Sequence, residues 1–200
     1  EKKTAVAIGP GIGTTDDARE FLYQIIRSSP VPLLIDADGL TLVAEEPGIL
    51  KKARVPLVLT PHPGEMSRLA GISTADVQAD RIGVSLGFAR EHGVYVILKG
   101  ARSLVSCPDG KVFVNTTGNP GMAAGGMGDV LTGITGGFLA QGMGAESACK
   151  LGVFAHGAAG DRAASERGEA GITASDLADA LPAVLKDIPT TDDEPFIRIR

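Results

Sequence analysis

The stretch TAVAIGPGIGTTDDAREFLYQIIRSS, residues 4–29, decides the fold class, because it joins a short apolar run to a helix through a glycine-rich turn. Residues 4–8 show no polar alternation, which is typical of a parallel strand buried on both faces. Asp16 and Asp17 begin a helix that we predict over residues 16–29, where acidic side chains favour the positive end of the helix dipole. The stretch therefore predicts a strand, a loop and a helix, which is the repeating unit of an α/β sheet.

The same alternation continues along the chain. Three more apolar runs predict strands over residues 33–35, 57–59 and 95–98. Helices predicted over residues 38–44, 64–70 and 74–92 are long enough to connect parallel strands. SLVSCPDGKVFVN predicts an antiparallel hairpin with its turn at residues 108–110, and three further helices follow, over residues 128–139, 145–167 and 175–185.

We therefore predict an α/β fold of three layers, with a mostly parallel central sheet flanked by helices and an antiparallel hairpin at the edge. With 200 residues, 44% of them hydrophobic, the chain can bury one core, so we expect a single domain over residues 1–188. Residues 189–200 are polar and follow a proline, and we expect a tail without an assigned role.

Composition excludes several classes of function. The net charge of -5, with dispersed basic residues, argues against a nucleic-acid partner. No apolar run approaches the roughly 18 residues of a membrane span, so we expect no membrane partner. The two cysteines show no CxxC or Cys/His spacing, so we expect no metal held by a dedicated set of protein ligands and a reducing, cytoplasmic location.

Three motifs directly follow predicted strands, at the edge where open α/β sheets bind ligands. GPGIG, residues 9–13, lets backbone amides approach a ligand, although such a turn is also a common exit from a strand. In LTPHPGE, two prolines fix the backbone around His62, which either faces a substrate or caps the next helix together with Glu65. Lys99 ends a strand in ILKG and either holds a phosphate or extends to solvent as a surface lysine.

The richest motif is NTTGNPGMAAGGMGDVLTGITGGFLAQG, residues 115–142, in which glycines run directly into an apolar helix. Unpaired amides and the positive end of the helix dipole meet there, so the sequence predicts an anion hole at Gly125, Gly126, Met127 and Gly128. The GK[ST] ending of a Walker A loop is absent. Asp129 either caps the helix or, since a phosphate site needs no second anion, acts as a base toward an attacking hydroxyl.

Four further polar residues have two interpretations each. Asp36 and Asp38, in LLIDADGL, end a predicted strand. In one interpretation they face the ligand crevice, or a magnesium ion held through water. In the other, Asp38 caps the following helix. His156 and Asp161, in FAHGAAGD, lie in a helix that we expect to pack closely on the helix of the anion hole. Close packing with satisfied hydrogen bonds is the favoured interpretation of this pair.

The motifs GPGIG, DADGL, LTPHPGE, LKG, NPGMAAGGMGDVLTG and HGAAGD, in this order, closely resemble the ADP-dependent NAD(P)H-hydrate dehydratases of the ribokinase-like superfamily. The resemblance spans about residues 5–185. A GxGD sequence at the start of a helix is shared with sugar, hydroxymethylpyrimidine and thiazole kinases. The histidine of TPHPGE and the end of the glycine run resemble the corresponding motifs of the dehydratases rather than those of the kinases.

The resemblance implies a ribokinase-like fold and a repair reaction, in which hydrated NADH or NADPH is restored while ADP is cleaved to AMP and phosphate. It implies Asp129 as the catalytic base, Gly11 and His62 as contacts of the hydrate, and residues 125–128 as the anion hole. It further implies nucleotide contacts from a set of loop and helix residues: Lys99, Gly100, Ala101, Arg102, Ser103 and Gly128.

ADP or ATP with Mg²⁺, a homo-oligomer and a partner NAD(P)H-hydrate epimerase are also implied by the resemblance. Family members carry a further stretch before GPG, so we expect that an N-terminal portion of the domain is missing here. Two alternatives stay open. One is an ATP-dependent small-molecule kinase with the same base and anion hole, and the other is a nucleotide-binding module without turnover.

Overall fold

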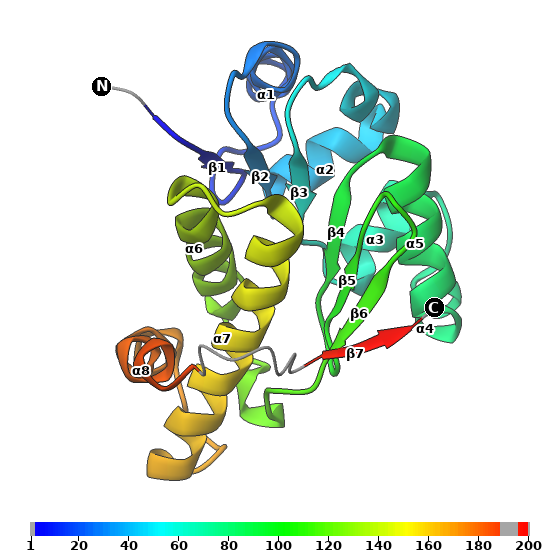
Figure 1. Cartoon of the computed structure of the whole chain (residues 1–200). Helices are drawn as coiled ribbons and strands as arrows, with labels where there is room; N and C mark the ends of the chain where they lie inside the picture. Colours follow the sequence, from blue (N-terminus) through cyan, green and yellow to red (C-terminus); the bar gives the residue numbers. More distant parts are fainter. Residues whose placement is uncertain (1–2, 189–195, 200) are drawn as a thin grey trace.

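The computed structural model describes residues 3–188 and 196–199, in which one seven-stranded sheet lies among helices (Figure 1). The strands lie in chain order: β1 (Val6–Ile8), β2 (Leu33–Ile35), β3 (Leu57–Leu59), β4 (Tyr95–Leu98), β5 (Leu104–Ser106), β6 (Val112–Asn115) and β7 (Phe196–Ile199). β1 to β4 pair in parallel, and β5 to β7 continue the sheet antiparallel. The predicted α/β fold with an antiparallel hairpin after the parallel strands is confirmed.

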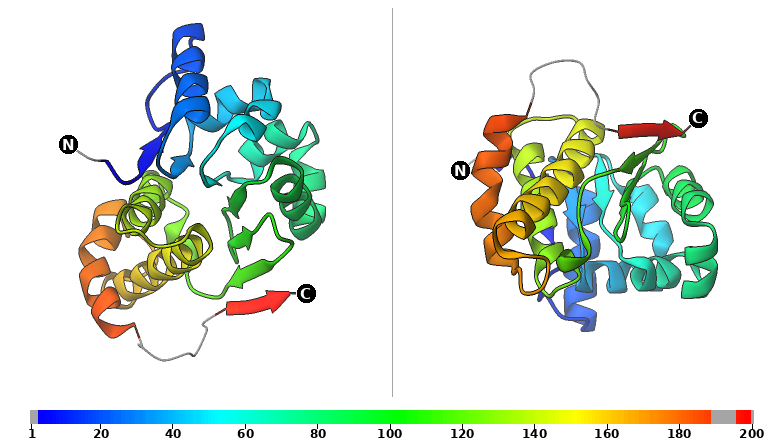
Figure 2. Two further views of the ribbon diagram at one scale, coloured as in Figure 1. Left: turned by 45° about the horizontal axis from the view of Figure 1, so that its top comes forward. Right: turned by 90° about the horizontal axis from the view of Figure 1, so that it is seen from below.

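Helices cover both faces of the sheet, which makes the predicted three layers (Figure 2). One layer holds α1 (Asp16–Ser28), α2 (Asp38–Glu45), the 3-10 helix η1 (Pro47–Lys52), α3 (Pro63–Ala70), α4 (Thr74–Ala79) and α5 (Arg81–His92). The other layer holds α6 (Met127–Ala140), α7 (Ala145–Arg167) and α8 (Ala174–Asp187), and the short 3-10 helix η2 (Pro120–Met122) precedes α6 in the chain. In the right-hand view of Figure 2 the strands run between these two groups.

The apolar runs bury their side chains alternately in two cores. Leu33 and Ile35 of β2 pack with the layer of α1 to α5, whereas Leu34 packs with α6 to α8. All three side chains have no exposed surface, which explains why these strands show no polar alternation. The three predicted parallel strands over residues 33–35, 57–59 and 95–98 have the bounds that the structure shows.

The helix predicted over residues 74–92 is wrong, because the structure divides it into α4 and α5 at Asp80. Asp80 leaves the helical conformation, with φ -139° and ψ 69°, and its carboxylate accepts from the amide of Gly83 at 2.8 Å. An aspartate competes with the helix for backbone donors and is favoured at an N-cap. The break makes Arg81 the first residue of α5.

The tail contains an element that the sequence did not lead us to expect. Residues 196–199 form β7, which pairs antiparallel with β6, so that Asn115 lies opposite Phe196. The strand extends the hairpin end of the sheet (Figure 1). Within the described residues, none of the helices combines the length and the apolar character needed to cross a bilayer.

Candidate active site

Four polar or glycine-rich segments meet beyond the carboxyl ends of the parallel strands. Gly9 follows β1, Asp36 follows β2, His62 follows β3 and Lys99 follows β4. In open α/β sheets this edge is the usual place for ligands. This is the edge at which the sequence predicted the site, and the contacts below show how its parts are held together.

A buried ion pair forms the centre of this edge. The ammonium of Lys99 lies 2.8 Å from Oδ1 of Asp36, and the hydroxyl of Thr132 in α6 donates to Oδ2 of Asp36 at 2.7 Å. Asp36 is only 1% exposed, so this carboxylate does not face an open crevice. Its charge is paired, and its hydrogen bonds join β2, β4 and the first half of α6.

The side chain of Lys99 lies at the start of α6, not on an outer surface. A Cβ added to Gly128 would lie 3.3 Å from Nζ of Lys99, and Oε2 of Glu65 lies 3.7 Å from the same Nζ. The lysine side chain is 19% exposed. The alternative of a solvent-exposed lysine is wrong, and a cation stands next to the predicted anion hole.

The glycine run ends in a helix start with free amide donors. Gly126 is the N-cap of α6, with φ 82°, and no side chain caps it. Within the described residues, the amides of residues 125–129 donate to no acceptor. A helix N-terminus with unpaired donors binds anions, and Lys99 adds a full positive charge beside it.

Asp129 is the third residue of α6 and is exposed to solvent. The capping alternative for this aspartate is not realised, because the N-cap is Gly126 and the hydrogen bonds and ion pairs among the described residues leave the carboxylate of Asp129 unused. A carboxylate without a partner, beside free amides and a lysine, can accept a proton from a bound hydroxyl.

His156 and Asp161 fasten the glycine run from behind, as the packing interpretation required. Nε2 of His156 donates to the carbonyl of Met127 at 2.8 Å. Asp161 accepts from the amide of Gly118 at 2.8 Å and from the side chain of Asn119 at 2.9 Å. Burial lowers the pKa of His156 to about 4, so the ring is a neutral donor near neutral pH.

His62 is the N-cap of α3, as in the second of its two interpretations, in which it caps this helix and does not face a substrate. Its Nδ1 accepts from the amides of Gly64 at 3.0 Å and Glu65 at 3.3 Å, and the carboxylate of Glu65 accepts from the amide of His62 at 2.7 Å. Since Nδ1 accepts, Nε2 carries the proton of the neutral ring. The imidazole remains 52% exposed, so its Nε2 side can still face a ligand.

The loop after β1 is shaped by glycines and by Asp38. Gly9, Gly11 and Gly13 all have positive φ, and Gly11 has open space where a Cβ would be. Oδ2 of Asp38 accepts from the amide of Gly13 at 3.0 Å. The alternative that Asp38 caps α2 is not realised, because the N-cap is Ala37 without a side-chain bond, and Asp38 binds the glycine loop instead.

The segment after β4 is a tight loop with two residues in unusual conformations. Gly100 has φ 132°, and Arg102, which is not a glycine, has φ 57°. The hydroxyl of Ser103 donates to the carbonyl of Gly100 at 3.2 Å, and Nη1 of Arg102 donates to the carbonyl of Thr116 at 2.6 Å. The structure therefore brings residues 99–103 together beside the start of α6 through Lys99.

Sequence analysis missed two side chains that shape the site, Thr132 and Arg81. Thr132 lies inside the apolar part of α6, where a threonine gives no signal of its role. Arg81 donates to backbone carbonyls 17 to 20 residues further along the chain, a contact that no local pattern encodes.

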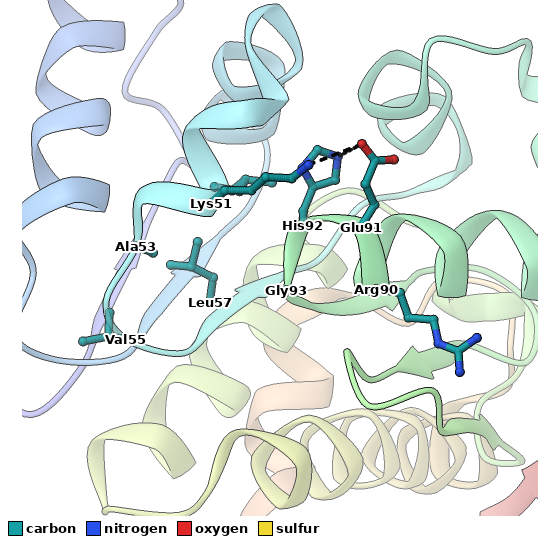
Figure 3. Close-up of a pocket in the computed structure, with 9 residues that line it drawn as sticks. Lys51, Ala53, Val55, Leu57, Arg90, Glu91, His92 and Gly93 are labelled. Carbon is teal, nitrogen blue, oxygen red and sulfur yellow. Dashed lines mark ion pairs between the residues drawn. The ribbon is translucent and has the colours of Figure 1, made fainter.

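A separate cavity of about 370 Å³ lies at the opposite edge of the sheet, where β3 begins and just before β4 (Figure 3). Its charged groups Glu91 and Lys51 pair with each other at 3.6 Å, while burial lowers the pKa of the adjacent His92. Arg90 points away from this group in Figure 3. Because ligands of open sheets bind at the carboxyl edge, this cavity is not the candidate site.

One group of possible metal ligands occurs among the described residues, Cys107, Asp109 and Glu146. It lies at the turn between β5 and β6, away from the carboxyl edge. The ammonium of Lys111 lies 2.7 Å from Asp109 and 3.0 Å from Glu146, so a cation of the protein already neutralises the two carboxylates. Burial raises the pKa of the Cys107 thiol to about 12, which opposes the thiolate that a metal needs.

Comparison with known proteins places this geometry in a family. Residues 1–183 match the family described as NAD(P)H-hydrate dehydratase. The bifunctional NAD(P)H-hydrate repair enzyme of Moorella thermoacetica is 45% identical over 92% of this chain, which covers 34% of that protein. The ADP-dependent (S)-NAD(P)H-hydrate dehydratase of Xanthomonas campestris is 37% identical over 92% of this chain and 62% of its own length.

Solved structures agree with this placement. The ADP/ATP-dependent NAD(P)H-hydrate dehydratase of Bacillus subtilis, co-crystallised with ATP and Mg²⁺ and soaked with CoA, superposes with a TM-score of 0.83 at 32% identity, over 93% of this chain and 67% of that one. A hydroxyethylthiazole kinase of Pyrococcus horikoshii, at 21% identity over 98% of this chain and 77% of that one, has a TM-score of 0.70 and shares the fold alone. This chain spans about a third of the bifunctional relatives and belongs to the NAD(P)H-hydrate dehydratase family, with a ribokinase-like fold.

Proposed function

We propose that this chain repairs NADH or NADPH that has been hydrated at the nicotinamide ring, converting the (6S)-hydrate and ADP to NAD(P)H, AMP and phosphate. The observation that carries the proposal is the unpartnered carboxylate of Asp129, in the first turn of α6 beside free amides. Family membership and the names of the relatives support the substrate and the nucleotide.

The phosphoryl group would be held by the start of α6. The amides of residues 125–128 would donate to its oxygens, while Lys99, which lies against Gly128, would neutralise charge that develops on them. Donors fixed before the reaction stabilise such charge without having to reorganise, which is why this arrangement favours phosphoryl transfer. Asp36 holds the ammonium of Lys99 in place at 2.8 Å.

Asp129 would act as the base in the first step. It removes the proton from the hydroxyl on the hydrated ring, the oxygen forms a bond to the terminal phosphorus of ADP, and the bond from that phosphorus to AMP breaks. In the second step the lone pair of the ring nitrogen expels the phosphate as the carbon–oxygen bond breaks. Loss of a proton from the neighbouring carbon restores the double bond.

The remaining contacts are proposals by position. Gly11 has open space above it, and His62 presents Nε2–H on an exposed ring, so both would contact the hydrate. Residues 99–103 would bind the adenine nucleotide, since Lys99 places this loop next to the anion hole. These assignments rest on position within the site, and residues 1–188 would form the catalytic domain.

Mg²⁺ fits this site only as an ion carried by the nucleotide. Asp36 is already paired with Lys99 and Thr132, and the set of possible metal ligands found in the described residues lies elsewhere. Mg²⁺ is commonly bound by phosphates and water with one or two carboxylates. It would reduce the negative charge of the phosphates, and the protein would contribute Lys99 and the amides of α6.

The assembly and setting of the chain are also proposals. We take it to work as a homo-oligomer in the cytoplasm. We further take it to work with an epimerase that interconverts the two hydrate epimers, a pairing that the word bifunctional in the names of the relatives supports. Light scattering would test the oligomeric state, and an epimer-specific assay would test the pairing with an epimerase.

Recovery of reduced-nicotinamide absorbance tests the function directly. Chemically hydrated NADH, ADP and Mg²⁺ are mixed with wild type, Asp129→Asn and Asp17→Asn, an exposed first-turn aspartate of α1 that serves as the matched control. We expect wild type and Asp17→Asn to restore absorbance and Asp129→Asn to lose about 100-fold or more in rate while it still binds ADP. Undiminished turnover by Asp129→Asn would exclude it as the base, and a stable phosphorylated product without NADH would indicate a kinase.

A further inference from the structure

Arg81, the first residue of α5, donates three hydrogen bonds, one to the last residue of β4 and two to the loop of residues 99–103. Nη1 donates to the carbonyl of Ala101 at 2.6 Å, and Nη2 donates to the carbonyls of Leu98 and Lys99, both at 3.3 Å. A planar guanidinium can serve several acceptors in fixed directions at once, which an ammonium cannot do with the same geometry. One side chain therefore binds the last residue of β4 and the loop that follows it.

The loop needs an external constraint of this kind. Gly100 has φ 132° and Arg102 has φ 57°, and a non-glycine residue in the left-handed region costs about 1–2 kcal/mol. Such conformations persist where surrounding contacts determine them. A Cβ on Gly100 would lie 3.2 Å from Nη2 of Arg81, so the guanidinium packs directly on the turn.

The guanidinium is engaged with backbone alone. Among residues 3–188, no carboxylate lies within ion-pair distance of Arg81, and its buried Nε has no hydrogen-bond partner. Burial lowers the pKa of Arg81, although a guanidinium stays charged. Partial burial of an arginine without an acidic partner is costly, and the hydrogen bonds to the three carbonyls offset this cost.

The contacts with Lys99 connect Arg81 to the site. The carbonyl of Lys99 accepts from Arg81, and the amide of Lys99 donates to the carbonyl of Pro61 at 2.8 Å, so the backbone of the lysine is held from both sides. Its side chain then lies against Asp36 and the start of α6. The direction of this side chain depends on the backbone that Arg81 holds.

We propose that Arg81 is a positioning residue, which holds residues 99–103 in the shape that binds adenine nucleotide and aims Lys99 at the anion hole. The proposal rests on the function proposed above, because it takes that loop as the nucleotide site. Arg81 itself touches no reacting atom. Its guanidinium engages the carbonyls of Leu98, Lys99 and Ala101, and no carboxylate of the described residues pairs with its charge.

The test compares Arg81→Met and Arg81→Lys with Arg90→Lys, which changes the other arginine of α5 outside the site. ADP binding is measured by calorimetry, and amide hydrogen exchange of residues 99–103 is measured without nucleotide. Losing charged hydrogen bonds to the loop should weaken ADP binding about 10- to 100-fold in both Arg81 variants and speed exchange in the loop. In both Arg81 variants the KM for ADP should rise by a larger factor than kcat falls. Arg90→Lys should match wild type in all of these measurements.

The outcomes separate the two proposals. Equal ADP affinity and equal loop exchange in wild type and Arg81→Lys would overturn the positioning role. Wild type that binds no ADP would instead refute the proposed function. If Arg81→Met does not fold, Arg81→Lys decides the question, because it keeps the charge and the aliphatic stem and loses only the planar fork.

Discussion

Replacing Asp36 by asparagine should remove the charge that holds Lys99 while preserving the shape of the side chain. Asp36 is 1% exposed and the Lys99 side chain is 19% exposed, so the ammonium would lose its main partner in a place that water barely reaches. The amide oxygen could still accept from Thr132, but its NH₂ group would then face the ammonium, donor against donor.

The size of the loss follows from the burial of the pair. Removing one partner of a buried ion pair costs about 3–5 kcal/mol, because the other charge is left uncompensated. Oε2 of Glu65 lies 3.7 Å from the same ammonium and offsets part of this cost. We therefore expect Asp36→Asn to lower the free energy of unfolding by about 3 kcal/mol, at the lower end of that range.

Urea unfolding measures this change. A loss of about 3 kcal/mol should lower the urea midpoint by about 1 M or more without changing the slope m. The double variant Asp36→Asn with Lys99→Met should recover much of the stability, because removing both charges leaves none unpaired. Glu45→Gln, which breaks the exposed pair with Arg19, is the control and should leave the urea midpoint nearly unchanged. Strict additivity of the two single changes would refute the reasoning.

Two further predictions separate binding from stability. Gly128→Ala should weaken ADP binding, because its Cβ would lie 3.3 Å from Nζ of Lys99 and would displace that ammonium. Calorimetry measures the affinity and a thermal melt shows that the variant is folded. Unaltered ADP affinity would contradict this prediction. Burial lowers the pKa of His156 in the folded protein to about 4, below its ordinary 6.5, so the unfolded chain binds the proton first as pH decreases. The free energy of unfolding therefore falls by up to about 3 kcal/mol as the pH is lowered from about 6.5 to about 4. His156→Gln should lack this component, so its stability difference from wild type, measured by urea unfolding, should shrink between about pH 7 and pH 4, and a constant difference would contradict it.

The sequence predicted most where one local pattern had one physical cause. The strands over residues 33–35, 57–59 and 95–98 were predicted to the residue because uninterrupted apolar runs are buried on both faces. The helix over residues 145–167 was bounded correctly by its flanking glycines. The helix predicted over residues 74–92 failed because the competition of Asp80 for the amide of Gly83 is a detail of one side chain.

The site was predicted as a set of positions but not as a set of contacts. The sequence placed Lys99, with residues 9–13 and His62, at one edge of the sheet, because each directly follows a predicted parallel strand, but it did not place the start of α6 there. It could not predict that Asp36 pairs with Lys99 across 63 residues, or that Arg81 holds the loop, because such contacts depend on the packed fold. For His62 the pattern allowed two functions, and a cap on α3 is compatible with a contact from the opposite ring nitrogen.

The glycines of this chain differ in what a side chain at their position would meet. A Cβ on Gly9 would overlap the carbonyl oxygen of Asp36, and one on Gly160 would overlap Met122, so these glycines let segments of the chain pack closely. At Gly11 and Gly125 a Cβ would meet nothing within 4 Å. Glycine at Gly125, whose φ is ordinary, therefore has no explanation in the packing of the described residues. The open space leaves the backbone of Gly125 accessible, which is compatible with the anion hole proposed at this position.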